Sequence, residues 1–231
     1  MTFQVALIGN EGIVLGSDRI HIFVGLQKLP HLQPRQRSTE CKILVSDDER
    51  VLCCFAGGPG SVSIAREIRK SCNPVGLSES AWRDRIEGAT KQIEGTGENF
   101  LDEVIVMRLD NQTGVMVVKQ GHNPIQFNPI NDHYFAGDYS DARFLASHLM
   151  GPNLTLSEMQ NLALTTLAYA HKNNPTGVGG GFDIFSVTPQ TTIQSAFFTE
   201  DDAARAESNF RDRARNIFKT DSRPVSIETA P

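Results

Sequence analysis

Short apolar runs alternate with compact polar turns along the first quarter of the chain, a pattern typical of antiparallel β-hairpins. Two hairpins are predicted from four such runs, at residues 5–9, 13–18, 41–45 and 51–56. Between the hairpins, residues 21–40 have a mixed polar composition and contain Pro30 and Pro34, so we expect an irregular loop there.

Helical spacing of apolar residues begins directly after the second hairpin. Residues from Val62 to Ile68 follow this spacing behind the turn Gly57-Gly58-Pro59-Gly60, and residues 78–94 repeat the pattern. Thr155 and Glu158 form a capping box, which predicts that another helix begins there. In chain order, the remaining helices are predicted at residues 141–150, 155–171 and 200–218. The remaining strands are predicted at residues 103–109, 114–119, 133–136, 182–187 and 192–197.

The order of these elements predicts the fold class. Helices come in pairs between groups of strands rather than singly between strands, which disfavours a doubly wound parallel sheet. We therefore predict an α+β fold, a sandwich of two antiparallel sheets covered by helices on both outer faces. Because no break in composition divides the chain, we expect one domain over residues 1–220 and a disordered tail over residues 221–231.

Composition and charge exclude several classes of protein. Hydrophobic residues make up 39% of the 231 residues and charged residues 21%, which fits a globular chain with a sizeable core. The net charge of −5 is spread along the sequence, so we expect no nucleic-acid partner. No apolar run approaches the roughly 20 residues that span a bilayer, and residues 1–5 do not resemble a secretory signal. We expect a cytoplasmic protein with no membrane partner.

Cysteine and histidine spacing gives no sign of a metal or redox site. The cysteines lack CxxC spacing, and two of them are adjacent in an apolar run, so we expect reduced thiols that pack in the core. They are Cys41, Cys53, Cys54 and Cys72. The histidines lack HxxxH spacing, so we expect no metal and no other cofactor.

The glycine turn at residues 57–60 has two possible uses. Free backbone N–H groups at the start of a helix would bind a phosphate group, but the turn lacks the sequence of a P-loop or a dinucleotide site. The same N–H groups would serve equally well as an oxyanion hole. The turn alone does not decide between the two.

Thr2 favours the second use. If Met1 is removed, the free α-amine of Thr2, with a pKa of about 8, would act as a base for the hydroxyl of the same residue. Such a site needs a lysine and an aspartate nearby to orient the nucleophile and bias its protonation. Asp18, at the end of the first hairpin, and Lys42, at the start of the second, are suitable in kind.

Four segments in this order resemble the N-terminal half of proteasome β-subunits and their bacterial ring-protease relatives, which belong to the N-terminal nucleophile hydrolases. The segments are Thr2, Gly16-Ser17-Asp18-Arg19, Lys42-Ile43 and Phe55-Ala56-Gly57-Gly58. The resemblance covers residues 2–70 and, more loosely, Ala136-Gly137 and residues 181–189. It implies a four-layer α-β-β-α sandwich.

The resemblance also implies a role for each matching residue. Thr2 would be the nucleophile and, through its amine, the general base. Asp18 and Lys42 would tune the amine and the hydroxyl, and the N–H of Gly57 would form the oxyanion hole. The loop at residues 21–40 is longer than usual, which would place it near the cleft and alter substrate specificity.

Three positions depart from the family pattern and are possible supporting residues. Asp138 stands in Gly137-Asp138-Tyr139, where the family usually has Gly-Ser-Gly. It would either stabilise a protonated amine or replace the usual downstream acid. Asn173 and Thr176 stand where an aspartate and a serine usually precede a late glycine pair.

The resulting hypothesis is a threonine-dependent amide hydrolase, most simply a peptidase that forms an acyl-enzyme on Thr2. The same site would act as a transpeptidase or peptide ligase if an amine outcompeted water, or on a non-peptide amide if the pocket were small. The competing hypothesis is a non-catalytic scaffold subunit with the same fold. We expect a peptide or protein substrate and, from the habit of the family, a homo-oligomer.

Overall fold

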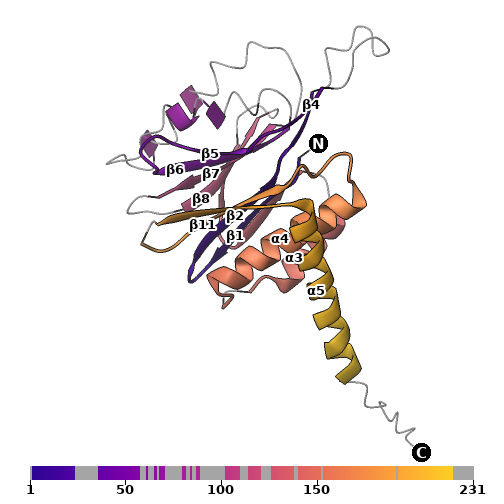
Figure 1. The fold of residues 1–231 in the computed structure, drawn as a ribbon. Helices are drawn as coiled ribbons and strands as arrows, with labels where there is room; N and C mark the ends of the chain where they lie inside the picture. The colour runs from indigo at the N-terminus through magenta and orange to yellow at the C-terminus, as the bar shows by residue number, and fades with distance from the viewer. Residues whose placement is uncertain are drawn as a thin grey trace, which may run out of the picture.

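Two five-stranded antiparallel sheets form the centre of the molecule (Figure 1). The computed structural model describes residues 2–23, 36–57, 61, 65, 66, 68–70, 80, 81, 84, 87, 88, 102–109, 114–120, 126–137, 140–151, 153–190 and 192–220. The first sheet has the order β10 (His133–Ala136), β1 (Gln4–Gly9), β2 (Gly12–Asp18), β11 (Phe182–Val187) and β12 (Ile193–Phe198). The second has the order β5 (Ile43–Val45), β6 (Val51–Ala56), β7 (Asp102–Arg108), β8 (Gly114–Gln120) and β9 (Gln126–Ile130).

Helices cover the outer faces of both sheets. Helices α3 (Ser140–Leu149) and α4 (Leu156–Asn173) lie on the first sheet, where α4 contacts β1, β2 and β11. Helix α5 (Glu200–Thr220) packs on α4 and extends away from the body towards its C-terminal end (Figure 1). On the far side of the second sheet lie the described helical residues between 61 and 88. This arrangement confirms the predicted α+β sandwich with four layers.

Strand β1 is buried on both faces, which explains its nearly continuous apolar sequence. Val5 and Leu7 point into the core shared with α4, whereas Ala6 and Ile8 point into the core between the two sheets. This alternation follows from the two-residue period of a strand. Each fully buried side chain of this size contributes roughly 1.5–3 kcal/mol, so β1 is fixed firmly in both directions.

The start of α4 is formed as its capping box predicts. Thr155 is the N-cap residue, and its hydroxyl accepts the N–H of Glu158 at 3.2 Å. The carboxylate of Glu158 accepts the N–H of Thr155 at 2.8 Å. Two backbone donors that would otherwise lack partners are thereby satisfied.

The irregular loop predicted at residues 21–40 is wrong at both of its ends. Strand β3 (Ile20–Phe23) pairs with β4 (Gln36–Thr39) to form a two-stranded antiparallel ribbon. The segment Gln36-Arg37-Ser38-Thr39 has no apolar alternation, so its pairing rests on backbone hydrogen bonds that leave no sequence pattern. Residues 24–35, which contain both prolines, lie outside the described residues.

Strand β9 is a second element that the pattern missed. It contains Pro129, a residue type that is rare inside sheets, and β9 lies at the edge of the second sheet. Proline is tolerated there because an edge strand does not need every N–H for pairing.

Other expectations fall partly or wholly outside the described residues. The predicted helix at 78–94 is described only at 80, 81, 84, 87 and 88, which are helical, and the tail at 221–231 is not described. The single domain over residues 1–220 stays a prediction. Within the described part of the chain, none of the helices has the length and apolar character needed to cross a membrane.

Candidate active site

Sheet register brings Thr2 and Asp18 to the same end of the sandwich. In the antiparallel pair β1–β2, Gln4 lies opposite Ser17, so the residues before β1 lie beside the end of β2. The N–H of Phe3 donates to Asp18 Oδ1 at 3.0 Å and thereby closes this end of the hairpin.

The second sheet supplies Lys42 and Gly57 to the same end. Lys42 directly precedes β5, and Gly57 directly follows its antiparallel partner β6. The side-chain amide of Gln4 donates to the carbonyl of Phe55, which links β1 to β6 across the two sheets. The four residues predicted from the first half of the chain therefore come from adjoining strand ends.

Lys42 links the hydroxyl of Thr2 to the carboxylate of Asp18. Its Nζ lies 2.9 Å from Thr2 Oγ1 and 2.8 Å from Asp18 Oδ1. Asp18 and Lys42 are fully buried, whereas Thr2 is only half-buried. The hydroxyl therefore lies where a buried ion pair reaches the surface.

Asp18 accepts hydrogen bonds from four donors. Besides Phe3 and Lys42, the N–H groups of Ile20 and Gly179 donate to Oδ2, at 3.1 and 3.4 Å. These donors orient the carboxylate and favour its charged form.

Burial shifts both members of the pair towards their neutral forms. Loss of hydration raises the pKa of Asp18 above its ordinary 3.8, and the attraction of Lys42 opposes this shift. Loss of hydration also lowers the pKa of Lys42 below its ordinary 10.5, and Asp18 opposes that shift. Lys42 therefore holds its proton less tightly than an exposed lysine does.

Gly137 forms a close contact behind Thr2. Its φ is +95°, and a Cβ at this position would lie 2.0 Å from the carbonyl oxygen of Thr2. Arg143 on α3 donates to the carbonyl of Gly137 and holds it in place. Only a glycine fits here. Asp138, the next residue and a predicted supporting residue, lies outside the described residues.

Gly57 also needs the conformational freedom of glycine, because its φ is +126° at the exposed end of β6. This conformation ends the strand just after Ala56. The role of its N–H as an oxyanion donor stays a prediction.

Asn173 and Thr176 lie away from this cluster. Asn173 is the exposed last residue of α4, and the hydroxyl of exposed Thr176 donates to Asn174 Oδ1 at 3.1 Å. Within the described residues, neither side chain forms a hydrogen bond with Thr2, Asp18 or Lys42. Gly179 approaches Asp18 instead.

An ion pair that the sequence analysis did not single out lies beside the cluster. Arg19 Nε and Nη2 donate to the two carboxylate oxygens of Asp183 at 2.7 and 2.8 Å, and the guanidinium lies 4.4 Å from the centre of the Phe197 ring. Half-buried Cys41 lies next to this pair, and burial raises the pKa of its thiol to about 11. The ion pair links the end of β2 to β11.

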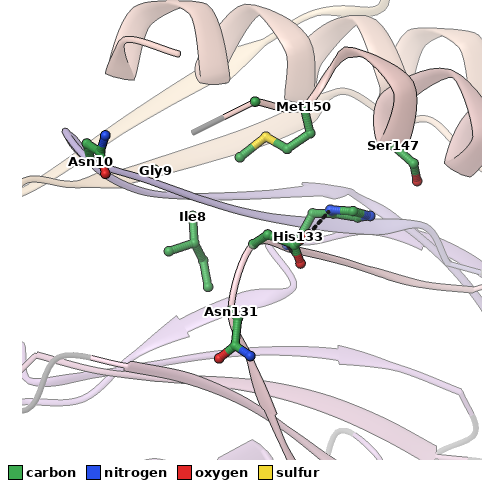
Figure 2. Close-up of a pocket in the computed structure, with 9 residues that line it drawn as sticks. Ile8, Gly9, Asn10, Asn131, His133, Ser147 and Met150 are labelled. Carbon is green, nitrogen blue, oxygen red and sulfur yellow. Dashed lines mark hydrogen bonds and ion pairs between the residues drawn. The ribbon is translucent and has the colours of Figure 1, made fainter. Parts of the chain in front are cut away.

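A separate cavity of about 290 Å³ lies at the opposite end of β1 (Figure 2). Its lining residues are Ile8, Gly9, Asn10, Asn131, Asp132, His133, Ser147, Met150 and Gly151. Because Thr2 precedes β1 and Gly9 ends it, this cavity is not part of the candidate active site. In the part of the chain that the structure describes, no group of three or more acidic, histidine or cysteine side chains could hold a metal ion.

Comparison of structures finds proteins with the same fold, whereas comparison of sequences finds no match. No family model and no curated protein matches the chain. An Anbu Gly-1 mutant from Hyphomicrobium sp. strain MC1 superposes with a TM-score of 0.72 at 13% identity, over 95% of this chain and 97% of that one. Anbu, an ancestral beta-subunit, from Yersinia bercovieri gives 0.71 at 15% identity, over 94% and 96%.

The Anbu complex from Pseudomonas aeruginosa, described as a helical assembly, gives a TM-score of 0.69 at 15% identity, over 97% of this chain and 98% of that chain. Likeness at this identity establishes the fold alone. The chain has the proteasome-like sandwich fold of these Anbu structures.

Proposed function

We propose that the chain is a threonine-dependent amide hydrolase acting on peptides, with Thr2 as its nucleophile after removal of Met1. One observation carries the proposal. Lys42 Nζ lies 2.9 Å from Thr2 Oγ1 and 2.8 Å from Asp18 Oδ1, at the half-buried end of an otherwise buried pair. A lysine in this position would favour loss of the hydroxyl proton and stabilise negative charge on Oγ1.

In the proposed reaction, Thr2 Oγ1 attacks the carbonyl carbon of the substrate amide and passes its proton to the α-amine of the same residue. The carbonyl oxygen becomes an oxyanion, which the N–H of Gly57 stabilises. The C–N bond then breaks, and the departing nitrogen takes the proton from the α-amine. An ester on Thr2 remains.

Water completes the cycle. It gives a proton to the α-amine as its oxygen attacks the ester carbonyl. The ester C–O bond then breaks, Oγ1 takes that proton from the α-amine to restore the Thr2 hydroxyl, and a carboxylic acid is released. Lys42 stabilises the negative charge that develops on Oγ1 in both steps, and Asp18 holds Lys42 in position. If an amine attacks in place of water, the product is a new amide and the enzyme is a peptide ligase.

We further propose that the protein works in the cytoplasm as a homo-oligomer. The helical assembly of the Anbu complex from Pseudomonas aeruginosa supports the homo-oligomer through the shared fold. A non-catalytic scaffold would have the same fold, and the following test separates it from an enzyme.

The test is covalent labelling by a peptide epoxyketone, which reacts with an N-terminal threonine through both its hydroxyl and its amine. Intact mass should show loss of Met1 and one adduct, which Thr2→Ala abolishes and Thr2→Ser retains. Thr176→Ala is the matched control, because that exposed hydroxyl donates to Asn174 and, among the described residues, has no hydrogen bond to Thr2, Asp18 or Lys42. Retained Met1, or an adduct that survives Thr2→Ala, would overturn the enzymatic assignment.

A further inference from the structure

A glycine loop joins α4 to β11 and lies directly against Asp18. We define it as residues 177–181, in which Gly179, Gly180 and Gly181 have φ values of +146°, +72° and +89°. Backbone of this kind has little intrinsic stiffness, because glycine loses more freedom on ordering than any other residue. Contacts from the rest of the molecule must therefore hold the loop in place.

One side of the loop holds the residues of the candidate active site. The N–H of Gly179 donates to Asp18 Oδ2 at 3.4 Å. Its carbonyl accepts the N–H groups of Arg19 and Ile20, at 2.9 and 3.0 Å. Gly179 thus contacts the carboxylate of Asp18 and the two residues that follow it.

The other side of the loop rests on two side chains from the C-terminal helices. His171 Nδ1 lies 2.6 Å from the carbonyl oxygen of Val178, and Glu200 Oε1 accepts the N–H of Gly180 at 2.7 Å. The same two side chains approach each other, with His171 Nε2 3.8 Å from Glu200 Oε2. Because the partner of Nδ1 is a carbonyl, this nitrogen carries the hydrogen.

The packing around Gly179 is too tight for a side chain. A Cβ there would lie 2.6 Å from Glu200 Oε1 and 2.8 Å from His171 Nδ1. Gly179 is therefore held between Asp18 on one side and the His171–Glu200 pair on the other. A shift of the His171 or Glu200 side chain would therefore move Gly179, and with it the carboxylate of Asp18.

We propose that His171 and Glu200 are positioning residues for the Asp18–Lys42 pair and act through the glycine loop. This inference rests on the proposed function of that pair. Neither residue touches the reacting atoms, so they affect the rate through geometry alone. Misplacement of a catalytic group by about 1 Å costs up to about a hundredfold in rate, so small movements of the loop are sufficient.

The experiment compares variants that remove the two contacts with variants that keep them. His171→Leu and Glu200→Ala remove the donor to Val178 and the acceptor for Gly180. His171→Asn and Glu200→Gln keep a donor and an acceptor of similar reach. We expect the first pair to lower kcat by about tenfold to a hundredfold with KM nearly unchanged, and the second pair to stay within about threefold of the unmodified enzyme.

Lys172→Ala is the matched control. Lys172 follows His171 on α4 and contacts Glu207 of α5 at 3.5 Å, so this variant weakens the packing of the two helices without touching the loop. We expect an unchanged kcat. An equal loss of kcat in the control, or equal losses in the conservative and disruptive variants, would show a merely structural role and overturn the inference.

A second readout does not depend on catalysis. Amide hydrogen exchange at Ile20 and Gly179, measured in a Thr2→Ala background, should accelerate in His171→Leu and Glu200→Ala and stay unchanged in the other three variants. If the epoxyketone test excludes an enzyme, this exchange pattern alone decides whether the two residues position Asp18. Unchanged exchange in all five variants would overturn the inference whatever the protein does.

Discussion

Two ion pairs lie side by side at the end of β2, and they differ in burial and in the choice of cation. Lys42 pairs with Asp18 at 2.8 Å, and their side chains are 1% and 0% exposed. Arg19 pairs with Asp183 at 2.7 Å, and their side chains are 29% and 6% exposed. Two adjacent residues, Asp18 and Arg19, thus belong to two different pairs.

The difference in cation and burial suits the Lys42–Asp18 pair to the proposed reaction and the Arg19–Asp183 pair to holding the fold together. The hydrogen bond to Asp183 raises the pKa of Arg19 above its already high ordinary value, so that cation never loses its proton, and its planar fork matches both carboxylate oxygens. Burial lowers the pKa of Lys42, and its Nζ also donates a hydrogen bond to the hydroxyl of Thr2. The arginine pair joins two strands, whereas the buried pair places a lysine that holds its proton less tightly beside the half-buried hydroxyl of Thr2.

The largest effect is expected from removing the buried cation. Lys42→Met should lower kcat/KM by about a thousandfold, because the charge that stabilises Thr2 Oγ1 is lost. It should also lower the free energy of unfolding by about 3–5 kcal/mol, since Asp18 is left as an unpaired buried carboxylate. Steady-state kinetics and urea denaturation measure the two losses.

The double variant Asp18→Asn/Lys42→Met separates these two consequences. It should recover most of the stability and none of the activity, because no charge remains buried. If activity returned together with stability, Lys42 would be only a structural partner of Asp18, and the contrast between the two pairs would fail.

The pH profile should reveal the same contrast. In the proposed reaction Lys42 acts as a cation, so kcat/KM should fall as pH rises through its pKa. Because burial lowers that pKa below 10.5, the alkaline limb should begin below 10.5 and approach a tenfold loss per pH unit. Asp183→Asn serves as the control and should not change the pH at which kcat/KM begins to fall. A plateau that extends beyond pH 10.5 would contradict the role of Lys42.

The site residues that could be predicted from sequence all lie at the ends of hairpin strands. Thr2, Asp18, Lys42 and Gly57 each lie within two residues of β1, β2, β5 or β6. Antiparallel pairing leaves little freedom at such positions, because the two-residue period and the turn set the register. Their order along the chain, which resembles that of proteasome β-subunits, therefore indicated their proximity. The sandwich itself followed from the paired helices between strand groups.

The rest of the site depends on contacts that local patterns do not record. His171 and Glu200 meet at the glycine loop only because α4 and α5 pack together. Asn173 and Thr176 were chosen because the resemblance implies an aspartate and a serine before a late glycine pair, and the longer glycine loop here made that match ambiguous. The ribbon β3–β4 was missed because the sequence of β4, Gln36-Arg37-Ser38-Thr39, has no alternation of apolar and polar residues. Arg19 and Asp183 were visible in the sequence, but no local pattern joins residues so far apart.

The smallest effect is expected from changing the cation in the half-exposed pair. Arg19→Lys keeps the charge beside Asp183 but loses the second hydrogen bond and the stacking on Phe197, so the free energy of unfolding should fall by about 1 kcal/mol. The value of kcat/KM should stay within about twofold, since this pair does not reach Thr2. Lys42→Arg is the mirror experiment and should lower kcat/KM by at least about a hundredfold, because a larger cation that holds its proton replaces one that fits between Thr2 and Asp18. Equal losses of activity in the two variants would mean that both ion pairs support the site in the same way. A loss confined to Lys42→Arg would show that the site needs a lysine at the buried position but accepts either cation at position 19.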